Sequence, residues 1–80
     1  MAKARVFVTL KKSVFDPQGK TIHDALVGMG YSGVQDVRQG KFFEVELQGT
    51  PDEARATAEE ISRKVLANPV IESFRVEIEA

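Results

Sequence analysis

The chain has 80 residues, no cysteine, and 11 lysine and arginine residues against 12 acidic residues, which gives a net charge of -1. This length predicts a single domain, residues 1–80, with a thin core and little room for a catalytic pocket and the residues that support one. The balanced charge argues against a nucleic-acid partner, and the lack of cysteine excludes disulfides, thiolate metal sites and thiol nucleophiles.

The N-terminal residues MAKARVFVTLKK contain no apolar run long enough for a signal peptide. No segment of the sequence reaches the length that is needed to span a bilayer. We therefore expect a cytoplasmic protein with no membrane partner.

Residues 4–11, ARVFVTLK, alternate between apolar and other side chains, which predicts a half-buried strand. The following segment contains Asp16-Pro17-Gln18-Gly19, a turn sequence that leads into a helix. Four apolar residues then recur at helical spacing, which predicts a helix from about Pro17 or Lys20 to Met29 with one stripe in the core: Ile22, Ala25, Leu26 and Met29.

Residues 28–33, GMGYSG, match the glycine spacing of a dinucleotide-binding loop. That motif works only between a strand and the N-terminus of a helix, where the helix dipole favours phosphate. Gly28 and Gly30 instead lie at the end of the predicted helix, where glycine ends a helix without strain. We therefore interpret these glycines as a helix terminus.

Residues 34–39, VQDVRQ, and residues 42–48, FFEVELQ, are both predicted as strands. Gly40-Lys41 between them is typical of a two-residue type II′ turn, so the two strands are expected to form a hairpin. Its register is open to a shift by one residue.

Thr50-Pro51-Asp52-Glu53 has the sequence of a capping box with proline in the first turn, which predicts a helix from Pro51 to about Ala67. Its expected apolar stripe is Ala54, Ala58, Ile61 and Val65, with Leu66 beside it. Residues 70–79, VIESFRVEIE, alternate again and predict a last strand.

The predicted order β-α-β-β-α-β indicates an α+β, ferredoxin-like fold, in which two helices cover one face of a four-stranded antiparallel sheet. The opposite face is expected to stay uncovered and to carry two phenylalanines. We therefore predict a homodimer or higher oligomer, and its candidate face comprises Phe7, Thr9, Phe42 and Glu44.

Few residues of the sequence are candidates for catalysis or for metal or ligand binding. His23 is the sole histidine and lies beside the apolar stripe, so a solvated helix residue is a better interpretation than catalysis. Alternating glutamates on the strands could pair across the sheet as an acid-base or metal site, although exposed glutamates more often prevent edge pairing: Glu44, Glu46, Glu77 and Glu79. Lys11, Lys12, Arg38 and Lys41 could form a small basic patch. We expect no catalytic, cofactor or metal residue in this chain.

Three segments resemble the PurS family, the small subunit of phosphoribosylformylglycinamidine (FGAM) synthase. They are VTLKKSVFDPQGKTIHDAL, VQDVRQGKFFEVEL and NPVIESFRVEI, and the resemblance extends over nearly the whole chain. The sequence departs from the family pattern at Phe15, Gln39 and Phe42.

The resemblance implies a subunit of de novo purine biosynthesis with no active site of its own. It would join a large synthetase subunit, which binds ATP and magnesium, and a glutaminase subunit, and support ammonia transfer between them. Its candidate partner interface comprises Asp16, Pro17, Gln18, Gly19, Arg38, Gly40 and Lys41. Each of these residues also has an explanation as turn chemistry.

Two other classes of function stay open at this level. A stand-alone regulatory module would bind a small ligand between ferredoxin-like protomers, and its melting temperature would rise with an amino acid or nucleotide. A small enzyme would need ionisable groups in a cleft and would lose activity on replacement of His23, Glu44 or Glu77.

Overall fold

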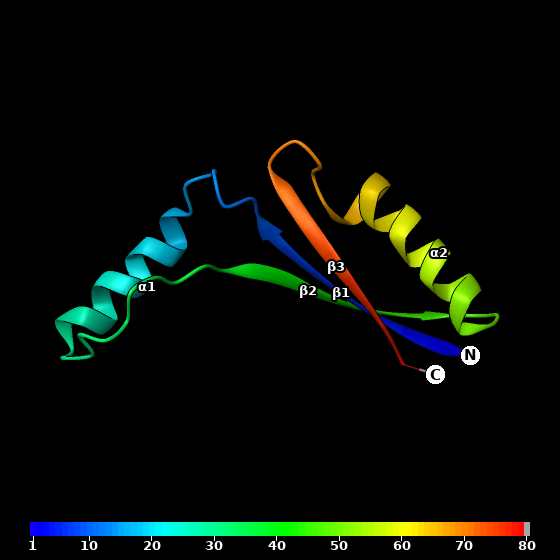
Figure 1. Ribbon diagram of the computed structural model, residues 1–80, viewed down its shortest axis with the longest axis horizontal. Helices are drawn as coiled ribbons and strands as arrows, with labels where there is room; N and C mark the ends of the chain where they lie inside the picture. The colour runs from blue at the N-terminus through cyan, green and yellow to red at the C-terminus, as the bar shows by residue number, and fades with distance from the viewer. Residues whose placement is uncertain (80) are drawn as a thin grey trace.

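The three strands form one antiparallel sheet with the order β2-β1-β3 (Figure 1). The computed structural model describes residues 1–79. β1 (Ala2–Leu10) is the central strand, β2 (Gly40–Leu47) and β3 (Glu72–Glu79) flank it, and the alternation in their sequences matches their burial. The strands predicted at residues 4–11, 42–48 and 70–79 are therefore confirmed. The predicted four-stranded sheet is wrong, because the sheet has three strands.

The missing strand is residues 34–39, which form no regular element. Gly40-Lys41 is not a hairpin turn but the first two residues of β2, with Gly40 opposite Thr9 and Lys41 opposite Val8. An added Cβ at Gly40 would lie 2.3 Å from the carbonyl oxygen of Val8. Gly40 is therefore explained by a close approach between two strands rather than by a turn.

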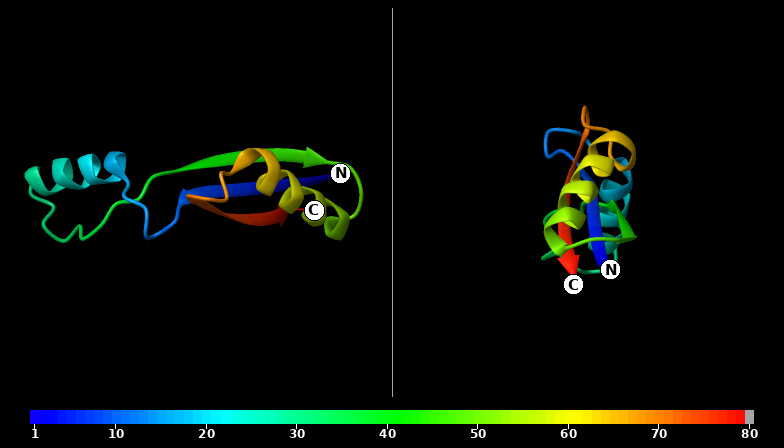
Figure 2. Two further views of the ribbon diagram at one scale, coloured as in Figure 1. Left: turned by 90° about the horizontal axis from the view of Figure 1, so that it is seen from above. Right: turned by 90° about the vertical axis from the view of Figure 1, so that its right-hand side faces the viewer.

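α1 (Pro17–Gly28) forms where the sequence predicts it, but it lies beyond the end of the sheet rather than on it (Figures 1 and 2). We call residues 11–39, which contain α1 and the extended chain that returns from it, the arm. The arm makes the molecule long, with extents of 48 × 26 × 13 Å and a radius of gyration of 15.8 Å. A compact chain of this length would have a radius of about 12 Å.

The position of α1 overturns the expectation that its apolar stripe lies in the core. Ile22 is 40% exposed and Met29 is 71% exposed. α1 ends as expected, since Gly28 is its last residue and Gly30 adopts a positive φ of 102°. The GMGYSG segment therefore lies at the end of a helix rather than at the start of one.

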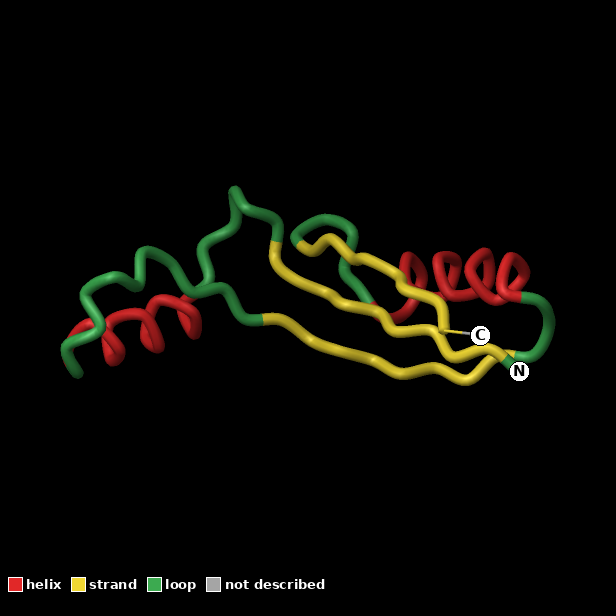
Figure 3. Tube along the Cα trace, turned by 60° about the horizontal axis from the view of Figure 1, so that its bottom comes forward, coloured by secondary structure: helices red, strands yellow, loops and turns green. Residues whose placement is uncertain are grey.

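α2 (Pro51–Ile61) is the helix that packs on the sheet, across β1 and β3 (Figure 3). Its capping box is confirmed: Thr50 accepts a hydrogen bond from the Glu53 backbone N–H at 3.2 Å, and the Glu53 carboxylate accepts one from the Thr50 N–H at 3.0 Å. Ala54 and Ala58 are fully buried, so the small side chains do allow close packing.

The predicted stripe fails at Val65, which is 77% exposed. α2 continues into a π-helical turn, η1 (Ser62–Leu66), in which the Ala67 N–H donates to the Ser62 carbonyl at 2.9 Å. A π turn has more residues than an α turn, so it rotates the following residues around the helix axis. Ser62 and Ala67 therefore face the core while Val65 faces solvent.

The core is small and lies between α2 and the inner face of the sheet. We use inner face for the sheet side that α2 covers and outer face for the opposite side. Val6 and Val8 are fully buried at the centre of the inner face, and partly buried residues pack around them: Phe43, Leu66, Phe74 and Val76. None of the helices in residues 1–79 is long and apolar enough to cross a membrane.

Candidate partner-binding site

Four of the predicted interface residues and Gln39 meet where the arm joins the sheet. We call the group formed by Asp16, Gln18, Gly19, Arg38 and Gln39 the Asp16 junction. Pro17 lies beside it as the first residue of α1, and Gly40 and Lys41 follow it in β2. The arrangement therefore brings together two segments that are about twenty residues apart in the sequence.

Asp16 is the centre of the junction and is only 6% exposed. One carboxylate oxygen caps α1 by accepting a hydrogen bond from the Gly19 N–H at 3.0 Å, and the other accepts one from the Gln39 N–H at 2.8 Å. These two bonds, the Gln39 bond above all, lower the pKa of the Asp16 carboxyl, and the nearby charge of Arg38 lowers it further. A buried carboxylate thus fastens the returning chain to the start of α1.

Arg38 links the returning chain to the loop that follows β1. Its guanidinium donates hydrogen bonds to the carbonyl oxygens of Lys11 at 2.9 Å and Val14 at 2.8 Å. The Gln39 side-chain amide donates to the side-chain oxygen of Gln18. Arg38 was predicted as a partner contact, and the structure gives it a second role within the chain, because it satisfies carbonyl groups of the loop after β1.

Gly19 is present for steric reasons. A Cβ at this position would lie 2.2 Å from the carbonyl oxygen of Val37 and 2.7 Å from a carboxylate oxygen of Asp16. Its φ is not positive, so the requirement is space rather than backbone freedom. The glycine allows the extended segment to lie directly against the first turn of α1.

A cavity of about 250 Å³ opens beside the junction, between it and the adjoining ends of the strands. Its polar lining comes from Thr9, Asp16, Gln18, Gln39, Lys41 and Glu72. The Lys41 ammonium lies 3.5 Å from the Glu72 carboxylate, so the two charges offset each other. The lining offers amide and carboxylate hydrogen-bonding groups, which suit a polar segment of a partner protein.

The outer face carries an aromatic cluster at its centre. The rings of Phe7 and Phe42 are 5.0 Å apart, and the Arg75 guanidinium lies 4.4 Å from the centre of the Phe7 ring. Phe7 pairs with both Phe42 and Arg75 in the register, and Thr9 and Glu44 lie on the same face. Alternation along the strands puts Arg75 on the same face as the phenylalanines, but only the register shows that it is the residue of β3 beside Phe7.

The four glutamates of the outer strands do not pair with one another. β1 lies between β2 and β3, so Arg5 is the cross-strand neighbour of both Glu44 and Glu77, and Lys3 is the neighbour of both Glu46 and Glu79. Arg5 donates a hydrogen bond to Glu79, and the Lys3 ammonium lies 3.8 Å from Glu44. A row of cations separates two rows of anions, which overturns the idea of side-by-side carboxylates.

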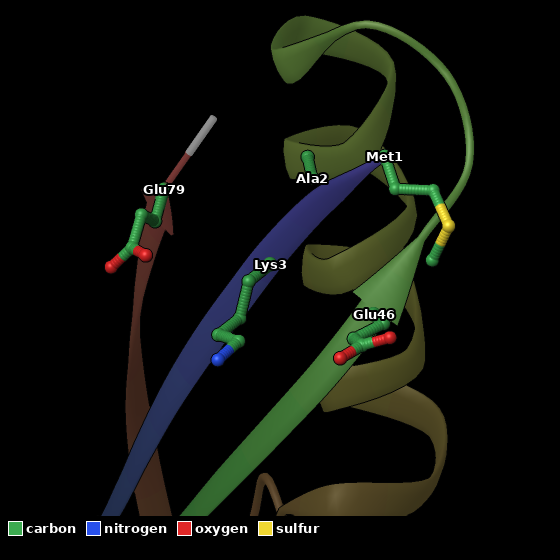
Figure 4. Close-up of a pocket in the computed structure, with 5 residues that line it drawn as sticks. All are labelled: Met1, Ala2, Lys3, Glu46 and Glu79. Atoms are coloured by element: carbon green, nitrogen blue, oxygen red, sulfur yellow. The ribbon is translucent and has the colours of Figure 1, made fainter.

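A second cavity of about 220 Å³ lies at the end of the sheet farthest from α1 (Figure 4). Lys3 lies between Glu46 and Glu79 there, and Met1 and Ala2 complete the wall. The mixture of one cation and two anions resembles the rest of the outer face. This cavity is therefore a continuation of the charged surface at the chain's N-terminal end.

His23 lies on α1 with its Nδ1 3.0 Å from a carboxylate oxygen of Asp24. This hydrogen bond, and a second one from Lys20, lower the pKa of the Asp24 carboxyl. Within residues 1–79 there is no group of three His, Cys, Asp or Glu side chains that could hold a metal ion. The hydrogen-bond partner of His23 is thus its own neighbour on α1.

The chain is similar over its length to one family of known proteins. Residues 3–80 match the family PurS, described as phosphoribosylformylglycinamidine (FGAM) synthase. The FGAM synthase subunit PurS of Bacillus subtilis is 44% identical over 79 residues, which cover 99% of this chain and 94% of that protein. The PurS subunit of Methanocaldococcus jannaschii is 38% identical over 80 residues, with 99% and 96% covered.

Solved structures agree with the sequence comparison. A B. subtilis PurS crystal structure superposes with a TM-score of 0.88 at 44% identity, with both chains fully covered. A chain of the structure of PurLQS from Thermotoga maritima superposes with a TM-score of 0.79 at 27% identity, with 99% of each chain covered. Since sequence and fold agree from end to end, this chain belongs to the PurS family of FGAM synthase subunits, which serve purine biosynthesis.

Proposed function

We propose that this chain is a non-catalytic subunit of FGAM synthase that bridges a large synthetase subunit and a glutaminase subunit and supports ammonia transfer between them. The complex would convert formylglycinamide ribonucleotide, glutamine and ATP into FGAM, glutamate, ADP and phosphate. The observation that carries the proposal is the likeness over 99% of both chains to a chain of a PurLQS assembly. ATP and magnesium would be bound by the large subunit rather than by this chain.

The distribution of charged groups supports a role without catalysis. The outer-face glutamates lie across from Lys3 and Arg5 of the central strand, so opposite charges face one another over the whole row. Asp16, the carboxylate that is least exposed, uses both oxygens to hold the backbone. The reactive groups of the overall reaction are then expected on the larger subunits.

The exposed surface supports a role in assembly. Large apolar side chains are exposed on the arm and on the sheet, among them Phe15 at 66%, Tyr31 at 57% and Phe42 at 52%. Surfaces of this kind commonly mark contacts with other proteins. We propose that the chain associates as a homodimer or higher oligomer in the cytoplasm, and that the Asp16 junction and the aromatic cluster of the outer face contact the two larger subunits.

Co-expression with the large synthetase and glutaminase subunits of the same organism tests this role. With an affinity tag on this chain, both subunits are expected to be retained in the presence of glutamine and nucleotide. Glutamine-dependent FGAM formation by the two larger subunits is expected to require this chain. Retention of neither subunit, together with unchanged FGAM formation without the chain, would falsify the proposal.

The regulatory-module alternative predicts a different result with the purified chain alone. Binding of an amino acid or nucleotide would raise its melting temperature, because a ligand that binds only the folded state stabilises it. The assembly role predicts no shift with glutamine, ATP or glycine at millimolar concentration.

A further inference from the structure

The outer face of the sheet changes in charge along its length. Its side chains form cross-strand rows, because β2 and β3 both pair with β1. The row nearest the arm is uncharged, and the next row is the aromatic cluster: Gly40, Thr9 and Ser73, then Phe42, Phe7 and Arg75. The two rows beyond the cluster hold two cations and four carboxylates: Arg5, Lys3, Glu44, Glu46, Glu77 and Glu79. The half of the face nearer the arm is therefore positive and the other half is negative.

Arg75 is the cation of the positive half, and aromatic and charged neighbours position it. Its guanidinium lies 4.4 Å from the centre of the Phe7 ring, a cation–π contact. One guanidinium nitrogen lies 3.4 Å from the carboxylate of Glu77, two residues along β3, and the Arg75 side chain is still 66% exposed. A guanidinium carries five N–H groups in a planar fork. One ion-pair contact therefore leaves donors of Arg75 for a group outside the chain.

A cavity of about 400 Å³ opens beside Arg75, and Phe7, Thr9, Ser73 and Phe74 complete its lining. Thr9 and Ser73 are cross-strand neighbours on the outer face, so their hydroxyl groups occupy adjacent positions next to the aromatic cluster. None of the lining residues is acidic. The cavity at the Asp16 junction and the cavity at the N-terminal end both contain carboxylates in their walls. The cavity beside Arg75 thus combines one cation with two hydroxyl donors.

This set of donors fits a carboxylate. An arginine fork binds a planar carboxylate through two parallel hydrogen bonds, and neighbouring hydroxyl groups can donate to the same oxygens. A phosphate group also fits an arginine fork, but it carries between one and two negative charges near neutral pH. Arg75 supplies a single positive charge, and the Glu77 carboxylate lies 3.4 Å from it. The single charge of a carboxylate is therefore the better match.

We propose that Arg75, Thr9 and Ser73 bind the carboxylate of an aspartate or glutamate side chain of one of the two larger subunits. This inference rests on the proposed assembly role and names the group that the outer face recognises. The exposed ring of Phe42 lies in the same row and takes an apolar side chain of the same segment. Rows repeat every two residues, about 7 Å, so a basic side chain of the segment lies about 7 Å farther along, over Glu44 and Glu77.

The outer face of a second copy is a poor source of this carboxylate. Glu44 and Glu77 both lie across from Arg5 in the register, and Glu46 and Glu79 both lie across from Lys3. Arg5 donates a hydrogen bond to Glu79, and the Lys3 ammonium lies 3.8 Å from Glu44. The carboxylates of this face are thus already offset by cations of their own sheet. A different protein is the source that the charge distribution favours.

A pair of matched arginine substitutions tests the site in the complex. Arg63 is exposed on η1, which packs on the inner face, so it serves as the control for loss of an exposed arginine. Arg75→Gln is expected to raise the dissociation constant for the larger subunits about tenfold or more, measured with glutamine and nucleotide present. Arg63→Gln is expected to leave the constant within about twofold of wild type. Ser73→Ala removes one hydroxyl donor and is expected to weaken binding about threefold.

The salt dependence of binding separates lost charge from lost packing. Interactions between exposed charges are screened by salt, whereas apolar contacts of the arginine side chain are not. The ratio of the dissociation constants of Arg75→Gln and wild type is therefore expected to fall as NaCl is raised from about 0.05 M to about 0.5 M. Unchanged melting temperatures of the purified variants confirm that the substitutions do not act through folding.

Carbodiimide cross-linking identifies the group that binds Arg75. This reagent activates a carboxylate, and an amine in contact with it then forms an amide bond without a spacer. In the complex, the Arg75→Lys variant is expected to become linked to an aspartate or glutamate of a larger subunit, which peptide mass spectrometry locates. The Arg63→Lys variant is expected to yield at least about fivefold less linked product, because its amine has no adjacent carboxylate of a partner.

The outcomes separate this site from the assembly role. Wild type that retains the larger subunits, together with Arg75→Gln that binds them equally well, would overturn the site and leave the assembly role intact. Wild type that retains neither subunit would overturn both. The site would also be overturned if retention were unchanged while Arg75→Gln abolished saturable binding of free glutamate to the purified chain, or dissociated its oligomer. These results would assign Arg75 to a small carboxylate or to a second copy.

Discussion

The Asp16 carboxylate accepts a hydrogen bond from the backbone N–H of Gln39, 23 residues later in the chain, at 2.8 Å. The same side chain caps α1 through Gly19. One buried carboxylate therefore sets both the start of the helix and the path of the chain that returns from it. The position of the arm, and with it the surface that the subunit offers to other proteins, depends on this contact.

Replacement of Asp16 by alanine is expected to lower the melting temperature and to loosen residues 34–39, because two backbone N–H groups lose their acceptor. Hydrogen exchange at Gly19 and Gln39 should rise in the variant. Asp36→Asn removes an exposed carboxylate from the same arm and is the matched control. Protection at both amides that is unchanged in Asp16→Ala would contradict the role of the junction.

The stabilising effect of Asp16 should depend on pH. Its folded-state pKa is lowered, so its contribution is present at pH values above the unfolded pKa, about 3.9, and is lost as the pH falls through the lower folded value. The difference in melting temperature between wild type and Asp16→Ala should therefore be constant from pH 7 to pH 5 and shrink below about pH 4. A difference in melting temperature that grows on acidification would contradict a stabilising role of the ionised Asp16 carboxylate.

Two glycine-to-alanine substitutions test whether Gly19 is required because there is no space for a side chain. Gly19→Ala is expected to destabilise the chain by about 1–3 kcal/mol, because the new methyl group would overlap the Val37 carbonyl. Gly28 has no atom within 4 Å of an added Cβ, so Gly28→Ala should be neutral or stabilising by up to about 1 kcal/mol. Urea unfolding measures both, and equal effects would argue against the close approach.

The capping box of α2 gives a similar comparison. Thr50→Ala removes the acceptor for the Glu53 N–H and is expected to cost about 1 kcal/mol of unfolding free energy. Thr50→Ser keeps a hydroxyl at the same position and should cost at most a few tenths of that. Equal losses in the two variants would show that the hydroxyl contributes nothing.

The aromatic cluster of the outer face is expected to contribute to binding rather than to folding. Phe42 is 52% exposed, so Phe42→Ala should change the melting temperature little while weakening retention of the larger subunits about tenfold or more. Val65→Ala, at a residue that is 77% exposed on η1, is the control for loss of an exposed apolar side chain. Equal retention by the two variants would remove this cluster from the proposed interface.

Local patterns in the sequence predicted local structure well. β1, α1, α2 and β3 were found near their expected bounds, because alternation, helical spacing and capping act within a few residues. Val65 was predicted in the apolar stripe but is exposed, because the π turn of η1 has no clear sequence signature. The resemblance to PurS identified the family from the same residues that predicted the elements.

The path of residues 34–41 could not be predicted, because long-range contacts decide it. VQDVRQGK has the alternation and the glycine of a hairpin, but Asp16 and Arg38 hold the segment against the loop after β1. The glycine that indicated a turn is needed for a close approach to Val8. The predicted interface residues did gather at one place, yet their internal hydrogen bonds show that most of them also hold the arm.

The most direct test of the account is FGAM formation from glutamine by the large synthetase and glutaminase subunits of the same organism, measured with and without this chain. We predict that the glutamine-dependent rate is restored only when this chain is added, and that ammonia-dependent synthesis by the large subunit depends on it less. Glutamine-dependent synthesis at the full rate without this chain would contradict the account.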